Sequence, residues 1–293
     1  EGYVHLQDGF TVRGEVRLVG AKIGGDLACR GGIFRYTEKS VNAQTARING
    51  ACLMDRTFLA LGTVDLSGAF VNGNFSCSNG TSSAKSEAIH SPRATIGGNV
   101  SLGTECRIAG QISFQGASIG GDMTFAGGSF EGKPAINLRN AKIDGMLIWR
   151  DVVHARGELN LAGASCLTLN MDWKSWAKPE RVRLDNFTWQ RFAELPEGCN
   201  AEFWRDWLER QPEKHLTTRF RPNPYQHLAN VLDRMGHEEE ARAIRIERRE
   251  RQRIFSTHHE PMPEDGLQRG LRHLANFWRW VQKIFIGHGY RPG

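Results

Sequence analysis

A motif repeated about every 23 residues is the feature that most limits what this chain can fold into. It is clearest in GEVRLVGAKIGGDL at residues 14–27 and in GQISFQGASIGGDM at residues 110–123. The steps between successive copies are 30, 18, 25, 23, 24, 23 and 23 residues, so the alignment predicts one long and one short copy early in the chain. The small residue before I-G-G marks the copies at Ala21, Ala51, Ala69, Ala94, Ala117, Ala141 and Ala164, with a degenerate eighth at Phe187.

Apolar residues recur at fixed positions around this alanine. They stand five and three residues before it, two residues after it, and six and eight residues after it. Two apolar residues spaced two apart are typical of a β-strand with one buried face. The pattern therefore predicts three short strands in each copy, with Ser91 and Thr57 as the clear exceptions. In the first copy the apolar positions are Val16, Leu18, Ile23, Leu27 and Cys29.

Turn-forming residues separate these strands. Gly and Asn recur there because they tolerate positive φ at low steric cost. Each copy is predicted to run strand, corner, strand, corner, strand, followed by a looser return. The first corner has Gly20, Gly50, Gly68, Gly116, Gly163, Asn140 or Asn186, with Arg93 as the exception, and the second has pairs such as Gly24-Gly25 and Gly120-Gly121.

Stacked copies of this kind form a parallel β-solenoid, which we expect over residues 1–195. Seven or eight coils stack about 4.8 Å apart, and we expect the coil to be right-handed. The A-x-I-G-G-D-L pattern over about residues 12–190 resembles the pentapeptide-repeat and bactofilin-like β-solenoids. A coil of about 23 residues exceeds what either relative normally uses. The resemblance implies a scaffold, a polymer or a mimic.

The C-terminal third changes character, because tryptophan and charge replace the glycine corners. Residues 200–210 (NAEFWRDWLER) predict an amphipathic helix. We expect the aromatic residues from about residue 170 onward, together with a helical cap over residues 196–255, to cover the open end of the solenoid, whose core and edge strands need a cap. These aromatic residues include Trp173, Trp176, Trp189, Trp204 and Trp207.

Residues 224–253 predict a helix-turn-helix hairpin that looks like a single tetratricopeptide-type unit. We expect this hairpin to dock on the solenoid or to form a homodimer. Its second helix is rich in arginine, which indicates a solvated, salt-bridged face, an anionic lipid contact or an acidic partner. No groove-reading motif for nucleic acid accompanies the charge. The candidate contacts to an acidic partner are Arg245, Arg248, Arg249 and Arg253.

Residues 256–293 predict a linker, over 256–266, and then a basic amphipathic helix. A basic helix with tryptophan is typical of a membrane interface, and a final helix packed on its own domain is the alternative. The candidate contacts to an anionic membrane surface are Arg269, Arg272, Trp278, Arg279, Trp280 and Lys283.

A second resemblance favours the membrane. The order of solenoid, Y-x-x-L-A-x-V-L hairpin, Arg/Glu helix and the terminal G-H-G-Y-R-P of Gly287–Pro292 is similar to a group of bacterial membrane-associated proteins. In that group a similar segment leads into hydrophobic spans. The resemblance implies a region of a membrane-anchored protein at the cytoplasmic side of the bacterial inner membrane.

The sequence contains none of the common catalytic or cofactor motifs. The chain has no dinucleotide fingerprint, P-loop, zinc-protease motif or nucleophile elbow, so we expect no cofactor, no metal and no catalytic residue. Asp26 and Asp122 lie in one column but four coils apart, about 19 Å, whereas paired glycosidase carboxyls lie about 5–9.5 Å apart. We expect the Asp and Asn residues of this column to bond their own backbone at the turn. His90 and His154 show no partner in the sequence.

The net charge limits the partners that the chain can bind, and the spacing of its cysteines indicates the state of their thiols. The net charge of +6 permits an acidic partner or an anionic membrane and disfavours mimicry of DNA. The six cysteines show no C-x-x-C pair, and several of them fall in the apolar columns of the core, so we expect reduced thiols that behave as small apolar side chains. We expect a non-catalytic binding or scaffold platform. The alternatives are an enzyme acting on carbohydrate or acyl substrates, and a solenoid that assembles through its ends.

Overall fold

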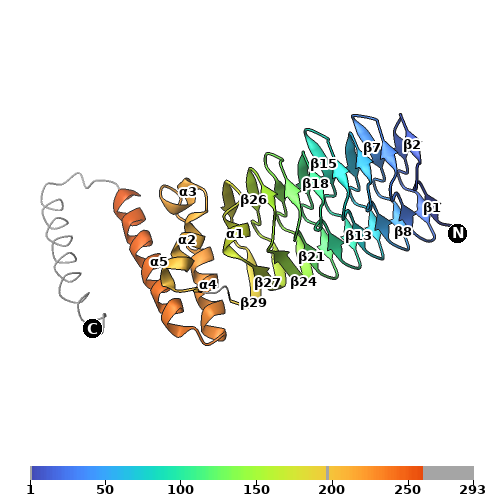
Figure 1. Cartoon of the computed structure of the whole chain (residues 1–293). Coiled ribbons are helices and arrows are strands. Elements are labelled where there is room, and N and C mark those ends of the chain that lie inside the picture. The colour runs from blue at the N-terminus through green and yellow to red at the C-terminus, as the bar shows by residue number, and fades with distance from the viewer. Residues whose placement is uncertain (1, 196–197, 260–293) are drawn as a thin grey trace, which may run out of the picture. The chain divides into compact units, whose positions relative to one another are not determined.

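The computed structural model describes residues 2–195 and 198–259, in which parallel strands of successive coils stack into three sheets (Figure 1). This is the predicted parallel β-solenoid, with about eight coils some 23 residues apart. The eight-stranded sheet contains one strand from each coil. In chain order these are β3 (Val16–Arg17), β7 (Lys39–Asn42), β11 (Thr63–Asp65), β15 (Glu87–His90), β19 (Gln111–Ser113), β23 (Ile136–Asn137), β26 (Glu158–Asn160) and β28 (Arg181–Arg183).

The fourteen-stranded sheet combines two ladders, because each coil contributes a strand on either side of its second corner. The first ladder is β4 (Lys22–Ile23), β8 (Arg47–Ile48), β12 (Phe70–Val71), β16 (Thr95–Ile96) and β20 (Ser118–Ile119). The second is β1 (Val4–His5), β5 (Leu27–Ala28), β9 (Cys52–Leu53), β13 (Phe75–Ser76), β17 (Val100–Ser101) and β21 (Met123–Thr124). The longer strands β24 (Lys142–Trp149), β27 (Ser165–Met171) and β29 (Thr188–Phe192) join the ladders in the last coils.

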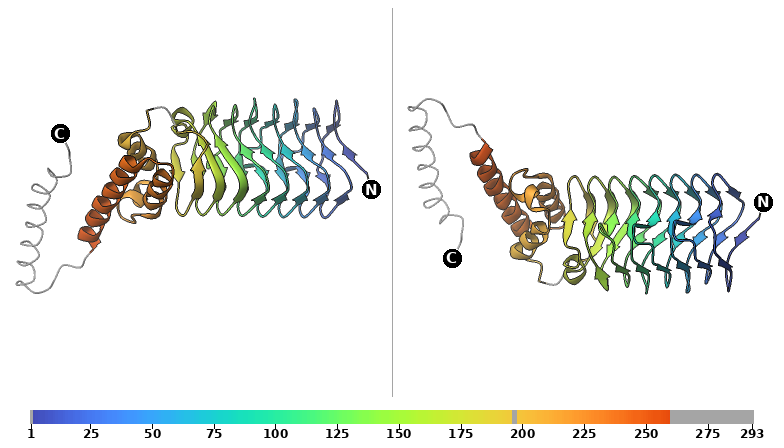
Figure 2. Two further views of the ribbon diagram at one scale, coloured as in Figure 1. Left: turned by 90° about the horizontal axis from the view of Figure 1, so that it is seen from below. Right: turned by 90° about the horizontal axis from the view of Figure 1, so that it is seen from above.

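The return segment adds a fourth short strand that the apolar columns did not predict. These strands form the seven-stranded sheet, and the two views of Figure 2 show the strands of successive coils in register. They are β2 (Thr11–Val12), β6 (Ile33–Phe34), β10 (Leu59–Ala60), β14 (Thr81–Ser82), β18 (Arg107–Ile108), β22 (Ser129–Phe130) and β25 (His154–Ala155).

The observed register corrects the sequence alignment in the second coil. Ile23 pairs with Ile48, and Ile48 pairs with Val71, so the alanine of this coil is Ala46 and the choice of Ala51 was wrong. With Ala46 the first three steps become 25, 23 and 25 residues, and the long and short coils disappear. Thr57 is then no longer an exception to the apolar columns.

The same correction moves Gly50 to the second corner, where it belongs to a stacked column of glycines. Each backbone N–H in this column donates to the carbonyl of the glycine one coil earlier, as Gly98 does to Gly73 and Gly121 to Gly98. A β-carbon on Gly121 would lie 2.0 Å from Oδ1 of Asn99. The column therefore needs glycine because neighbouring coils approach too closely for a side chain.

The Asp and Asn residues after the second corner bridge coils, which corrects the prediction that they bond their own turn. The backbone N–H of Asn99 donates to Oδ1 of Asn74 at 2.8 Å, and that of Asp122 donates to Oδ1 of Asn99 at 2.8 Å. Asp26 and Asp122 accept in the same way from Ala51 and Met146 at 2.7 Å. The missing glycine β-carbons leave the space that these side chains occupy.

The inward columns form one continuous core. Five of the six cysteines lie in it as free thiols, as predicted, and Cys199 is half-buried. Burial raises the pKa of Cys29 and of Cys166 to about 12. These thiols therefore stay protonated at neutral pH and behave as small apolar side chains.

Five helices follow or interrupt the last coils within the described residues. They are α1 (Trp173–Trp176), α2 (Ala201–Glu209), α3 (Glu213–Leu216), α4 (Asn223–Arg234) and α5 (Glu238–His259). The predicted helix at 200–210 and the predicted hairpin are both present. The helix α5 continues to His259, so residues 256–259 of the predicted linker are helical, and the rest of that linker lies outside the described residues.

The helices cover the last coil, as the aromatic composition predicted. Trp176, Trp204 and Trp207 are fully buried, and Trp176 stacks on Trp207 with ring centroids 4.8 Å apart. The helix α4 contacts β29, so the hairpin docks on the solenoid.

Candidate binding surface

The outer face of the fourteen-stranded sheet presents a continuous column of side chains, one from each coil. Each of these residues follows the inward alanine, or Phe187 in the last coil, and so points away from the core. All are exposed except Ser165, which is half-buried. The column runs Lys22, Arg47, Phe70, Thr95, Ser118, Lys142, Ser165 and Thr188, and neighbours in this order are register partners.

The first three members form a cationic and aromatic patch. Phe70 is 39% exposed, and it pairs directly with Arg47. Arg47 pairs in turn with Lys22, so three consecutive coils place these groups about 4.8 Å apart. No residue of the column is acidic. Aromatic residues and arginine contribute most to protein interfaces, so the patch has the chemistry of a contact site for an acidic partner.

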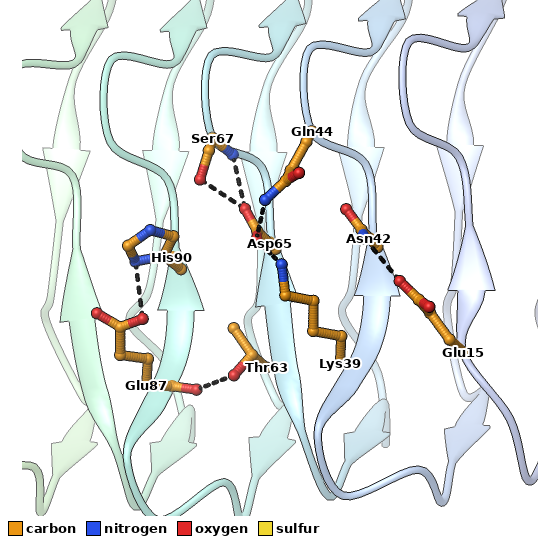
Figure 3. A network of polar contacts seen from close by, with 9 residues as sticks. All are labelled: Glu15, Lys39, Asn42, Gln44, Thr63, Asp65, Ser67, Glu87 and His90. Atoms are coloured by element: carbon orange, nitrogen blue, oxygen red, sulfur yellow. Dashed lines mark hydrogen bonds and ion pairs between the residues drawn. The ribbon is translucent and has the colours of Figure 1, made fainter.

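The outer face of the eight-stranded sheet carries a different surface, a network of polar contacts (Figure 3). Its central member, Asp65, is only 2% exposed. Its carboxylate accepts from Lys39 Nζ at 2.8 Å and from Gln44 Nε2 at 2.7 Å. It also accepts from the backbone N–H of Ser67 at 3.0 Å and from the Ser67 hydroxyl at 2.6 Å.

These contacts decide the chemistry of Asp65. Burial by itself would raise the pKa of Asp65, but the hydrogen bonds from Lys39, Ser67 and Gln44 outweigh it and lower that pKa. A carboxylate with a lowered pKa and four donors is a poor proton acceptor. Since Lys39 and Asp65 lie on adjacent coils, the ion pair ties the coils together.

A second contact of the network also joins neighbouring coils. Asn42 donates to Glu15 of the preceding coil at 2.6 Å. Within β15, His90 Nδ1 lies 3.1 Å from Glu87 Oε2. On the seven-stranded sheet, outside the network, His154 Nε2 lies 3.3 Å from Glu131 Oε1, so both histidines have partners that the sequence did not reveal. The network supports the stack of coils.

The arginines predicted to contact an acidic partner lie on α5, and part of the set has partners within the protein. Arg245 donates to Asp233 through both terminal guanidinium nitrogens, Nη1 and Nη2, and Arg248 donates to Gln226 at 3.1 Å. Arg249 is exposed. Arg253 is exposed near the end of α5 and also makes an interaction.

The predicted membrane contacts Arg269, Arg272, Trp278, Arg279, Trp280 and Lys283 lie outside the described residues. Among the helices that the structure describes, none is long and apolar enough to cross a membrane. Within the same residues, no group of three or more His, Cys, Asp or Glu side chains is placed to hold a metal ion.

The exposed column was missed by sequence reasoning, although a signal for it exists. It occupies the variable position of the A-x-I-G-G motif, whereas the residues that define the motif point inward. With the register of the second coil corrected, Arg47 occupies the same motif position as Lys22 and Phe70 and lies between them in the stack.

No protein-family model, no curated protein and no solved structure matches this chain.

Proposed function

We propose that the chain is a non-catalytic binding platform, whose solenoid presents the exposed column of the fourteen-stranded sheet to an acidic protein partner. The observation that carries the proposal is the patch of Lys22, Arg47 and Phe70, three exposed groups on consecutive coils without an acidic neighbour in their column. A rigid scaffold holds these groups in place before binding, which lowers the entropic cost of association.

The environment of the polar groups supports a binding role over a catalytic one. Asp65, the most buried carboxylate on the outer surface, already has four donors. The proposal also takes the chain to be related to the pentapeptide-repeat and bactofilin-like solenoids and to the bacterial membrane-associated group that its sequence resembles. On that basis the platform is tethered at the cytoplasmic face of the membrane by the segment beyond α5.

Site-specific photo-crosslinking tests the platform. A photoreactive residue replaces Thr95, the register neighbour of Phe70, in the full chain within cells that make it. We expect discrete crosslinked products that disappear with Arg47→Glu, because a reversed charge repels an acidic partner. The matched control places the same group at the exposed Thr11 of the seven-stranded sheet. Identical products from both positions, or none, would count against the proposal.

Liposome co-sedimentation tests the tether separately. The chain, with and without residues 266–293, is mixed with neutral or anionic vesicles at two salt concentrations. We expect binding that requires the tail and anionic lipid and weakens with salt, because basic residues near a surface are screened by ions. Equal sedimentation of both chains would show that residues 266–293 do not take part in membrane binding. The proposal of a binding platform would still stand.

A further inference from the structure

A groove lies where the outer face of the last coils meets the helical cap. Its floor is formed by residues of β24, β27 and β29, and the helix α4 forms its wall. The groove has a volume of about 290 Å³, close to the lower end of ligand sites, which begin at about 300 Å³. A site of this size accepts a molecule of a few heavy atoms.

Several hydrogen-bond donors of this groove are not engaged within the described part of the chain. The guanidinium of Arg234 is exposed and has no carboxylate partner among those residues. The hydroxyls of Ser165 and Thr188, which are register partners on adjacent coils, likewise make no hydrogen bond there. A guanidinium and two hydroxyls that line the same groove are donors of the kind that bind a carboxylate or phosphate group.

The charges of the groove leave a net positive field. Among the described residues that line it, Asp144 is the only carboxylate, and Lys142 Nζ lies 2.8 Å from Asp144 Oδ1 and neutralises it. The wall residue His227 has Nε2 at 2.9 Å from both the backbone N and the backbone O of Trp189, so this nitrogen is committed to β29. Arg234 therefore supplies the charge that is not compensated.

The floor adds an apolar contact. Leu167 is 39% exposed on the outer face of β27. Contact of the Leu167 side chain with water is unfavourable. A short hydrocarbon chain bound beside the charged wall would cover this apolar surface.

We propose that this groove binds a small organic carboxylate, with the anion on Arg234 and the hydroxyls of Ser165 and Thr188, and the hydrocarbon on Leu167. The site lies on the capped end of the solenoid and is independent of what the rest of the exposed column binds.

Butyrate is the probe for the test, and the full chain carries methyl-labelled leucine. The Leu167 methyl resonances, assigned with a Leu167→Ile variant, are followed by NMR as butyrate is added. We expect a saturable shift with butyrate and none with butyramide, which has the same shape without the charge. Inorganic phosphate should bind more weakly than butyrate, because it makes no contact with Leu167.

Variants locate the charge. Arg234→Gln should weaken butyrate binding at least about tenfold, because a hydrogen-bonded ion pair is lost. Arg107→Gln is the matched control, since Arg107 is an exposed arginine on β18 of the seven-stranded sheet and lines neither the groove nor the exposed column. The Tm of both variants should equal that of the parent chain. Equal shifts with butyrate and butyramide, tighter binding of phosphate, or equal weakening by both variants would overturn the proposal.

Discussion

At the scale of single residues, the glycines of the second corner set how closely the coils approach. In Gly121→Ala the new methyl group would meet Oδ1 of Asn99, which accepts the backbone N–H of Asp122. We expect this variant to lose about 1–3 kcal/mol of stability through crowding and a disturbed hydrogen bond. The urea midpoint of unfolding measures the loss. Gly14→Ala is the control, because nothing lies within 4 Å of the added methyl group, and an equal loss in both would contradict the argument.

Arg93 allows the opposite prediction. It occupies the first corner with φ of 56°, where other coils have Gly20 at 65° or Asn140 at 57°. A side chain costs roughly 1–2 kcal/mol in this region, while glycine loses about 0.5–1 kcal/mol more entropy on folding. Arg93→Gly should therefore stabilise the protein by about 0.5–1 kcal/mol, seen as a higher urea midpoint.

A matched arginine separates this effect from the loss of charge. Arg139 directly precedes the first corner two coils later and has no positive φ. Arg139→Gly should destabilise the protein by about 0.5–1 kcal/mol, because only the entropic cost of glycine remains. A gain of stability in both variants would show that charge, not backbone strain, is responsible.

The alignment failed at a single residue for a physical reason. In the alignment centred on Ala51, the residues five and three before the alanine are Ala46 and Ile48. In the structure these two residues themselves occupy the alanine position and the position two after it, so the alignment is shifted by five residues. Ala51 and Leu53 thus mimic a motif, although the register places Ala46 and Ile48 there. Local periodicity cannot distinguish the two frames, because the strand pairing that distinguishes them joins residues about 23 apart.

At the scale of elements, the three strands of each coil that contain an apolar pair were predictable and the fourth was not. Each strand of the seven-stranded sheet is two residues long, and only one of its side chains points into the core. Examples of these inward residues are Phe34, Ser82 and Phe130. A single inward residue produces no period of two. These strands form because the neighbouring coils already hold the return segment beside its partners.

The contact between the helices and the last coil should weaken in acid. His215 is 5% exposed and lies 3.1 Å from Asp185, and His227 bonds to the backbone of β29. Burial lowers the pKa of His215 despite the opposing effect of Asp185, and Arg221, Lys214 and Arg183 lower it further. Burial also lowers the pKa of His227; the Trp189 backbone opposes this shift and Arg234 adds to it.

The sign follows from proton binding. Below about pH 6.5, the usual pKa of histidine, the unfolded chain binds more protons than the folded chain. The free energy of unfolding therefore decreases as the pH is lowered. The Tm should therefore be lower at about pH 5.5 than at about pH 7.5. In His227→Gln the drop should be smaller, whereas Thr11→Ser, at an exposed position of the seven-stranded sheet, replaces no titratable group and should leave it unchanged. A drop of equal size in all three proteins would place the titrating groups elsewhere.

At the scale of the whole molecule, the sequence predicted that helices would cover the solenoid but not how they would replace a missing coil. The edge strand β29 pairs only with β27. On its other side, backbone N–H groups donate to side chains of α4 and its C-cap, from Trp189 to His227 at 2.9 Å and from Phe192 to Met235 Sδ at 3.4 Å. Such contacts depend on how the helix docks, which no local pattern encodes.

Deleting residues 199–293 removes these acceptors together with Trp204 and Trp207. The truncated chain would expose an unpaired strand edge and the apolar rings of Trp176 and Trp189, which the helices bury in the intact protein. Exposed edges recruit other chains by strand pairing. We therefore expect aggregates or filaments, measured by size-exclusion chromatography with light scattering and by electron microscopy. Deleting only residues 260–293 keeps every described helix and should leave the size distribution of the intact chain unchanged. If the longer deletion were monodisperse, the last coil would be self-sufficient and the helices would serve a purpose other than closing the stack.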